Sequence, residues 1–236
     1  MRDNLNLFAR RFVLALQTST RVRAAGDPAP PEADLLQSSA GHVPGAGWLV
    51  GITACLVFAL SSLLLRGNPW EGLVAAVACT LATVLLTGAL NEGGLFRTAD
   101  RLGAADAGTG ALALFLLLAA KFALLAALAA AAEAAVMAAL FAGQVVSRFA
   151  PLLAAHWLDT SPQALRSLRV GALWCVVPLL LMVPAGGVAF LLAALIACAL
   201  GGFAFARFAP GPREPRAGAL QQVCEVAFYL GAAVAA

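Results

Sequence analysis

Charge is scarce in this chain. Asp, Glu, Lys and Arg together make up 11% of its 236 residues, whereas an average soluble domain contains about 25%. Hydrophobic residues make up 62%, against about 45–50% in such domains. This composition excludes an ordinary soluble domain. We therefore expect an all-α, polytopic membrane protein, and no nucleic-acid partner.

Cysteine and histidine patterns that bind metals or carry redox chemistry are also lacking. His42 and His156 stand alone, so neither makes a metal site by itself. No two of the five cysteines have the spacing of a zinc or redox motif, and all lie in apolar runs: Cys55, Cys79, Cys175, Cys198 and Cys224. We expect them to be buried as small hydrophobic residues. We expect no cleavable signal either, because polar and basic residues interrupt Asn4–Gln17.

Long apolar runs predict seven membrane-spanning helices, since a span needs about 20 apolar residues. The runs are Ala46–Leu65, Glu71–Leu90, Gly110–Leu128, Ala134–Ala155, Val170–Val183, Val188–Ala206 and Gly218–Ala236. The sequence PAGG at Pro184–Gly187 separates the fifth from the sixth. Residues 1–45 are expected to form a cytoplasmic segment, with an amphipathic helix at Asn4–Gln17 and a linker at 24–36. Residues 46–236 are then the membrane bundle of a single domain.

The arginines indicate how this bundle is oriented. When seven spans are counted, the side opposite the N-terminus holds Arg66 alone. The N-terminal side holds twelve arginines: Arg2, Arg10, Arg11, Arg21, Arg23, Arg97, Arg101, Arg166, Arg169, Arg207, Arg213 and Arg216. Because Lys and Arg collect on the cytoplasmic side of spans, we expect the N-terminus in the cytoplasm and the C-terminus outside.

Ionisable residues inside spans are costly and rare, so each one is a functional candidate. Lys121 lies in the middle of the third run, and Arg148 lies toward the cytoplasmic end of the fourth. Glu225 lies about two turns into the last run, after Gln221 and Gln222. The alternatives are structural: Lys121 paired with a carboxylate or carbonyl, Arg148 extended to the interface, and glutamines bonded between helices.

A second polar group lies in the stretch Leu86–Gly103, LTGALNEGGLFRTADRLG, which we expect to be a cytoplasmic loop. Glu92 and Asp100 flank the pair Gly93–Gly94, and Asn91 adds an amide. Mg²⁺ needs few protein carboxylates, because waters and substrate phosphates complete its coordination shell. The stretch is therefore a candidate magnesium site, with ordinary solvated loop charges as the alternative.

The same stretch resembles the signature of the cobalamin synthase family, the adenosylcobinamide-GDP ribazoletransferases, which typically reads TGALHEDGLADTADGLG. Five further segments resemble the family in the same order along the chain. They are FVLALQTSTR (Phe12–Arg21), SSAGHVPGAGWLVG (Ser38–Gly51), GALALFLLLAAKFALL (Gly110–Leu125), SRFAP (Ser147–Pro151) and GALQQVCEVAFYLG (Gly218–Gly231). The lysine, arginine and glutamines that are costly inside a span lie within the last three.

The resemblance implies the last step of cobalamin (vitamin B12) assembly, at the cytoplasmic face of a bacterial inner membrane. α-Ribazole or its 5′-phosphate would react with adenosylcobinamide-GDP, GMP would leave, and Mg²⁺ would be the cofactor. The lipid bilayer, a second copy of the chain and other cobalamin-assembly proteins are the further expected partners. The implied roles are Glu92 and Asp100 for the metal, Arg97, Lys121 and Arg148 for catalysis at the phosphates, and Asn91, Gly94, Gln221, Gln222 and Glu225 for substrate binding.

The chain departs from the family at the acidic positions of the signature. Asn91, Gly93 and Arg97 stand where the signature has a histidine and two aspartates. The segment Arg101–Gly110 is also shorter than expected and lacks an Asp-Ser-Arg motif. A second hypothesis is therefore a catalytically weak paralogue that binds corrinoid or nucleotide, or that assembles with an active synthase. A third is an unrelated transporter or membrane scaffold.

Overall fold

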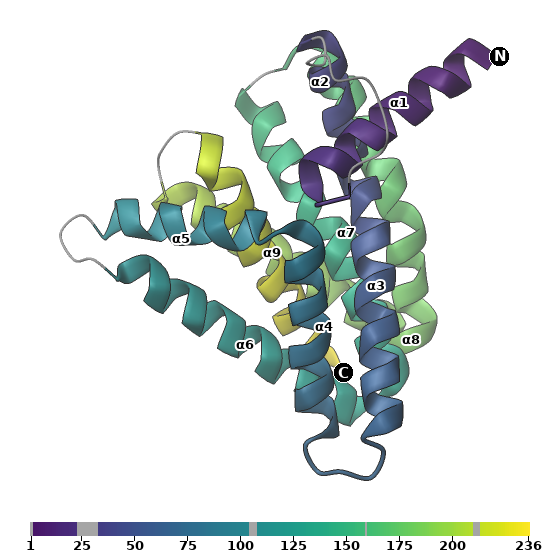
Figure 1. Cartoon of the computed structure of the whole chain (residues 1–236), viewed down its shortest axis with the longest axis vertical. Helices are drawn as coiled ribbons and strands as arrows, with labels where there is room; N and C mark the ends of the chain where they lie inside the picture. The colour runs from purple at the N-terminus through teal and green to yellow at the C-terminus, as the bar shows by residue number, and fades with distance from the viewer. Residues whose placement is uncertain (1, 23–32, 104–107, 159, 210–212) are drawn as a thin grey trace.

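The computed structural model describes residues 2–22, 33–103, 108–158, 160–209 and 213–236. Within these ranges the chain is helical and contains no β-strand, which confirms the predicted all-α class. The elements are α1 (Arg2–Ser19), α2 (Ala33–Ser39), the 3₁₀ turn η1 (Ala40–His42), α3 (Val43–Leu64), α4 (Glu71–Thr87), α5 (Leu90–Leu102), α6 (Thr109–Ala131), α7 (Glu133–Leu158), α8 (Pro162–Phe208) and α9 (Arg213–Ala235). Figure 1 shows α1 and α2 at the upper end of an upright bundle.

The helices identify a multi-pass membrane protein. Among the described residues, five segments are long and apolar enough to cross a membrane: Leu35–Leu64, Thr109–Ala131, Glu133–Trp157, Pro162–Phe208 and Arg216–Ala235. A sixth is added if α4 and α5, which meet at a sharp bend, count together as one span.

α8 accounts for the difference between these five or six segments and the seven predicted spans. It has 47 residues, although about 20 suffice for one crossing. Gly187 breaks it, with a φ of 84° and a ψ of 178°, a region that essentially only glycine adopts. The break falls in the PAGG segment, so the predicted fifth and sixth runs are its two arms. Counting both arms and α4 separately gives seven crossings.

The arginine-rich segments lie at one end of the bundle. α1 and α5 lie at the upper end in Figure 1, whereas the turn after α3, which carries Arg66, lies at the lower end. The N-terminus lies at the upper end, and the C-terminus lies toward the lower one. The two ends therefore differ as the arginine count predicts. Which end faces the cytoplasm stays a prediction.

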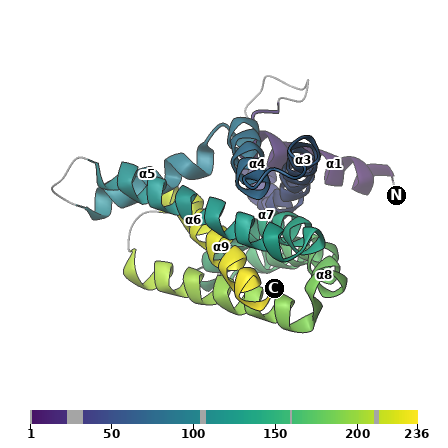
Figure 2. The ribbon, with the colours of Figure 1, turned by 90° about the horizontal axis from the view of Figure 1, so that it is seen from below.

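α5 lies across the upper end of the bundle, where the sequence predicted a loop. α4 and α5 meet at 89°, because Gly88 and Ala89 both have left-handed φ angles, of 69° and 58°. α5 therefore extends sideways from the top of α4 (Figures 1 and 2). The loop prediction was wrong for residues 90–102 because the glycine pair in this stretch weakened the helical pattern. A buried face that includes Leu95 and Thr98 holds the helix in place.

Small residues allow α7 to lie close to its neighbours. A β-carbon on Gly47 of α3 would lie 2.7 Å from the backbone oxygen of Gln144, and Gly143 lies against the ring of Tyr229 on α9. Such close approaches are usual where helices pack within a bilayer, because lipid is as apolar as the helix surface. They place the polar side chains of α7 in the middle of the bundle.

Candidate functional site

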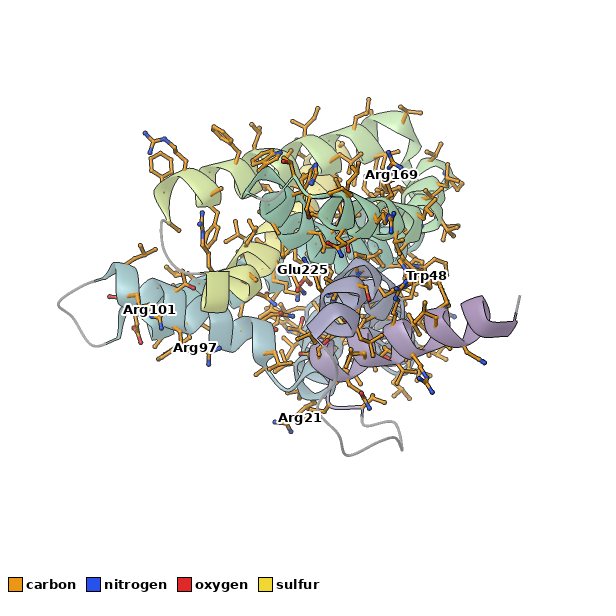
Figure 3. All side chains as sticks on the ribbon, turned by 90° about the horizontal axis from the view of Figure 1, so that it is seen from above. Arg21, Trp48, Arg97, Arg101, Arg169 and Glu225 are labelled. Atoms are coloured by element: carbon orange, nitrogen blue, oxygen red, sulfur yellow. The ribbon has the colours of Figure 1, made fainter. Side chains whose placement is uncertain are left out.

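A buried ion pair joins α6 to α9. Lys121 Nζ lies 2.5 Å from Glu225 Oε1, and the two side chains are 3% and 1% exposed. Viewed from the upper end, Glu225 lies near the centre of the helices (Figure 3). A lone charge at this depth would be very costly, and pairing reduces that cost. The carboxylate partner that was considered for Lys121 is therefore Glu225.

Gln144 of α7 extends the pair into a network. Gln144 Nε2 donates a hydrogen bond to Glu225 Oε1 at 2.5 Å, and Gln144 Oε1 accepts one from Arg148 Nη1 at 2.8 Å. Arg148 Nη1 also donates to the backbone oxygen of Gln144 at 2.5 Å. Arg148 is thus buried and held inward. The side-chain amide of Gln144 therefore links the carboxylate of Glu225 on α9 to the guanidinium of Arg148 on α7.

Tyr229, the only tyrosine in the chain, completes the set of donors around Glu225. Its hydroxyl donates to Glu225 Oε1 at 3.0 Å. Neither Tyr229 nor Gln144 was predicted from the sequence, because each is a single uncharged side chain in an apolar run, whereas Gln221 and Gln222 stand together near Glu225. A signal was present in the spacing. Gln144 precedes Arg148 by four residues and Tyr229 follows Glu225 by four, so each shares a helix face with an ionisable residue.

Glu92 of α5 reaches the same region from the upper end. Gln222 Nε2 on α9 donates to Glu92 Oε1 at 3.0 Å. Glu92 Oε2 and Gln222 Oε1 are buried without a hydrogen-bond partner. The two helices are close here, since a β-carbon on Gly218 would lie 3.1 Å from Asn91 Cα and 3.4 Å from Gly94 Cα. α5 is therefore held on the bundle by a contact that leaves polar atoms available.

These side chains enclose a small cavity beneath the start of α5. Its volume is about 10 Å³, which is room for roughly one water molecule. The lining residues are Thr83, Thr87, Asn91, Glu92, Lys121, Gln144, Arg148, Gln222 and Glu225. Six of them were predicted from the sequence. The two cations and two carboxylates balance, so the lining can offer cations to a phosphate without a large net charge of its own.

The remaining predicted residues lie outside this cavity. Arg97 is exposed on α5 (Figure 3). Asp100 Oδ1 accepts a hydrogen bond from the backbone N–H of Gly110, at the start of α6, at 2.6 Å. Gln221 is buried and its Nε2 has no partner. Gly94 contributes the close packing of α5 on α9.

Residues 11–233 match the protein family described as cobalamin-5-phosphate synthase. The chain belongs to this family. It is 37% identical to the adenosylcobinamide-GDP ribazoletransferase of Polaromonas sp. (strain JS666), over 98% of each chain. It is 34% identical to the protein of the same name from Albidiferax ferrireducens, over 98% of this chain and 99% of the relative. No solved structure matches.

In this member of the cobalamin-5-phosphate synthase family, the acidic signature lies on a helix. Positions 93, 97 and 100 follow the spacing i, i+4, i+7 and so share one face of α5. That face carries Gly93, Arg97 and Asp100, where the signature has three aspartates. A β-carbon on Gly93 would meet only Arg97 Nη1 within 4 Å, at 3.8 Å, so a larger side chain fits there.

The helix also separates the two carboxylates that were expected to share one metal ion. Glu92 and Asp100 are eight residues apart on α5, or about 12 Å along its axis. Ligands of one Mg²⁺ lie about 2.1 Å from it, so they are at most about 4 Å from each other. No three His, Cys, Asp or Glu side chains of the described segments form a group that could hold a metal. Glu92 Oε2, buried and unpaired, fits one position of a magnesium shell that water and phosphate would complete.

Proposed function

We propose that this protein is an adenosylcobinamide-GDP ribazoletransferase, which joins adenosylcobinamide-GDP to α-ribazole or its 5′-phosphate and releases GMP. The observation that carries the proposal is the buried network of Lys121, Gln144, Arg148 and Glu225 beneath α5. It occurs in a chain that aligns over nearly its whole length with relatives of that name. Fixed cations in a site that excludes water suit the transfer of a phosphate group.

The reaction is a displacement at phosphorus. A hydroxyl oxygen of the ribazole forms a bond to the phosphoryl group that carries adenosylcobinamide and releases its proton to water, and the bond from that phosphorus to GMP breaks. Lys121 and Arg148 would donate hydrogen bonds to the phosphate oxygens and offset the charge that develops on them. Glu225 would position Lys121, and Gln144 would position Arg148.

Magnesium is part of the proposal. Glu92 Oε2 and the side-chain oxygen of Asn91, both at the cavity, would contribute ligands beside the substrate phosphates. Bound there, the ion would neutralise charge on the pyrophosphate. Asp100 bonds to α6 and would have to leave it to join the same ion. The proposal therefore assigns the metal to Glu92.

α5 would act as a lid over this site. Ligand pockets usually have a volume of about 300–1,000 Å³, whereas the cavity holds about 10 Å³. Substrate phosphates therefore reach Lys121 and Arg148 only if α5 moves away from α9. Gly88 and Ala89 provide the bend about which it would turn, and the hydrogen bond between Glu92 and Gln222 would hold it closed.

The site would face the cytoplasm from a bacterial inner membrane. Its support is the arginine-rich upper end, where α1 and α5 lie, together with the bacterial origin of the relatives. Exposed leucine and phenylalanine side chains along α3, α6 and α8 suit contact with lipid tails.

A second candidate function is that of a weak paralogue that binds corrinoid or nucleotide without efficient turnover. Gly93 and Arg97 favour it, because they leave Asp100 as the one carboxylate on a face where the signature has three. Loss of two carboxylates weakens a site for a hard cation.

Turnover by the purified protein distinguishes the two candidates. The protein in detergent or lipid vesicles is mixed with adenosylcobinamide-GDP, α-ribazole or its 5′-phosphate, and magnesium. The proposal predicts GMP and corrinoid product in equal amounts, and neither with Lys121→Met. Binding of adenosylcobinamide-GDP without product would favour the second candidate. Absence of both binding and product would contradict both.

A further inference from the structure

A second, larger hollow lies beside the buried cavity. It is a cleft of about 470 Å³ between the end of α1 and the bend that joins α4 to α5. Its lining includes Thr18, Thr20, Arg21, Thr87, Gly88 and Leu90. The volume falls within the range of about 300–1,000 Å³ that is usual for small-molecule pockets. Thr87 lines both this cleft and the buried cavity, so the two hollows meet at that residue.

The backbone of Arg21 is fixed independently of its side chain. Its N–H donates to the backbone oxygen of Leu86, at the end of α4, at 2.8 Å. The side chain lies across Gly88, where a β-carbon would be 2.5 Å from Arg21 Nε. Two constraints therefore favour glycine at position 88: the left-handed φ, and the Arg21 side chain, which leaves no room for a β-carbon. Substitutions of the Arg21 side chain leave the backbone anchor in place.

Arg21 also has the charge to bind an anion. The side chain is exposed, at the margin of the upper end (Figure 3), and within the described segments it has no ion-pair partner. A guanidinium can bind a phosphate through two parallel hydrogen bonds. The cleft therefore places an available bidentate donor next to a buried site that contains two more cations, whereas the hydroxyls of Thr18, Thr20 and Thr87 donate to backbone oxygens.

The helix ends at the cleft have part of their carbonyl groups satisfied. α1 and α4 both end here, and free carbonyl groups at such ends would repel a phosphate. Three of these carbonyls have donors: Leu16 receives the N–H of Thr20, Val84 that of Ala89, and Leu86 that of Arg21. The first turn of α5, which begins beside the cleft at Leu90, has no side-chain cap on its N–H groups.

We propose that this cleft binds the phosphate group of a nucleotide substrate, with Arg21 as its ligand. The inference rests on the proposed transferase function and names the subsite of one phosphate. A nucleotide held by its phosphate at Arg21 extends past Thr87 toward the buried cations once the lid is open. The phosphate belongs either to the 5′-phosphate of the acceptor nucleoside or to the GDP portion of the donor.

Kinetics with matched substrates test the subsite. Arg21→Gln keeps hydrogen-bond donors and removes the charge. Arg21→Lys keeps the charge and removes the pair of parallel N–H donors. Arg169→Gln is the control, because Arg169 is exposed at the same end and lies away from the cleft (Figure 3). KM is measured for α-ribazole 5′-phosphate, for α-ribazole and for adenosylcobinamide-GDP.

With Arg21→Gln, we expect KM for one phosphate-bearing substrate to rise about 10- to 100-fold, as for the loss of a hydrogen bond between charged groups. KM for α-ribazole, which has no phosphate, should not change. A higher KM for α-ribazole 5′-phosphate shows that the bound phosphate belongs to the acceptor. A higher KM for adenosylcobinamide-GDP shows that it belongs to the donor. Equal changes for both acceptors, no change at all, or the same change in Arg169→Gln would overturn the proposal.

A binding measurement separates failure of this inference from failure of the transferase function. The dissociation constants of α-ribazole 5′-phosphate and GMP are measured for the wild-type protein and for Arg21→Gln, without a second substrate. Weaker binding by the variant supports the subsite even if the wild type shows no turnover. Equal binding by the two proteins, or no binding by the wild type, overturns the subsite whether or not turnover occurs.

Discussion

Lys121 and Glu225 are ion-pair partners inside the bundle, with Nζ 2.5 Å from Oε1. They lie on α6 and α9, so the pair fixes two helices that are distant in the sequence. The same carboxylate oxygen also accepts hydrogen bonds from Gln144 and Tyr229. Glu225 therefore stabilises the fold and holds the proposed catalytic lysine in one position. Substitutions here must be read for both effects.

Glu225→Gln should destabilise the protein. It leaves the Lys121 charge buried without a partner, and breaking one side of a buried pair typically costs about 3–5 kcal/mol. We expect a lower midpoint in thermal unfolding of the detergent-solubilised protein. The double variant Lys121→Met with Glu225→Gln removes both charges and should recover much of the loss. A stable Glu225→Gln protein that has lost only substrate binding would show that the pair is not structural.

Gln222→Leu should release the lid. Among the described residues, Gln222 makes the one side-chain hydrogen bond between Glu92 and α9, so without it the closed position of α5 loses about 1 kcal/mol or more. We expect faster amide hydrogen exchange in α5 and unchanged exchange in α7. Leu230→Ala, on the exposed side of α9, is the matched control. Unchanged exchange in α5 would contradict the role of Glu92–Gln222 as a latch.

Much of the fold was predictable because the bilayer imposes simple rules. Apolar runs of the required length gave the membrane-crossing segments, and PAGG located the break that divides α8 at Gly187. The same physics made polar side chains in apolar runs conspicuous: Lys121, Arg148, Glu225 and Gln222 all line one cavity. None of these steps needed knowledge of the packing.

The rest depended on geometry that the sequence does not state. The 89° bend requires a left-handed φ at Ala89, which alanine seldom adopts, so α5 could not be foreseen as a helix across the end. Once α5 is helical, its rise separates Glu92 from Asp100, which a loop could have brought together. Gln144 became central only because Gly47 and Gly143 bring its helix close to two others.

Topology is tested by labelling single sites. If the arginine-rich end is cytoplasmic, a reporter at Arg166 should be inside, and reporters at Arg66 and Ala236 outside. The reporters at Arg66 and Ala236 check each other, because each one follows a different membrane crossing. A cytoplasmic reporter at Ala236 would contradict an odd number of crossings.

Restoring the acidic face of α5 should strengthen magnesium binding. Gly93→Asp with Arg97→Asp places three carboxylates at positions 93, 97 and 100, on one face of the helix, and the space at Gly93 admits the larger side chain. Two added negative charges and one lost positive charge should tighten magnesium binding about tenfold or more, because charge count sets the affinity of such oxygen sites. Calorimetric titration of the detergent-solubilised protein measures this. The control is Gly93→Asn with Arg97→Asn, which has nearly the same shape without the carboxylates. Equal magnesium affinity for the aspartate and asparagine variants would show that this face of α5 is not a metal site, and would leave Glu92 as the remaining candidate.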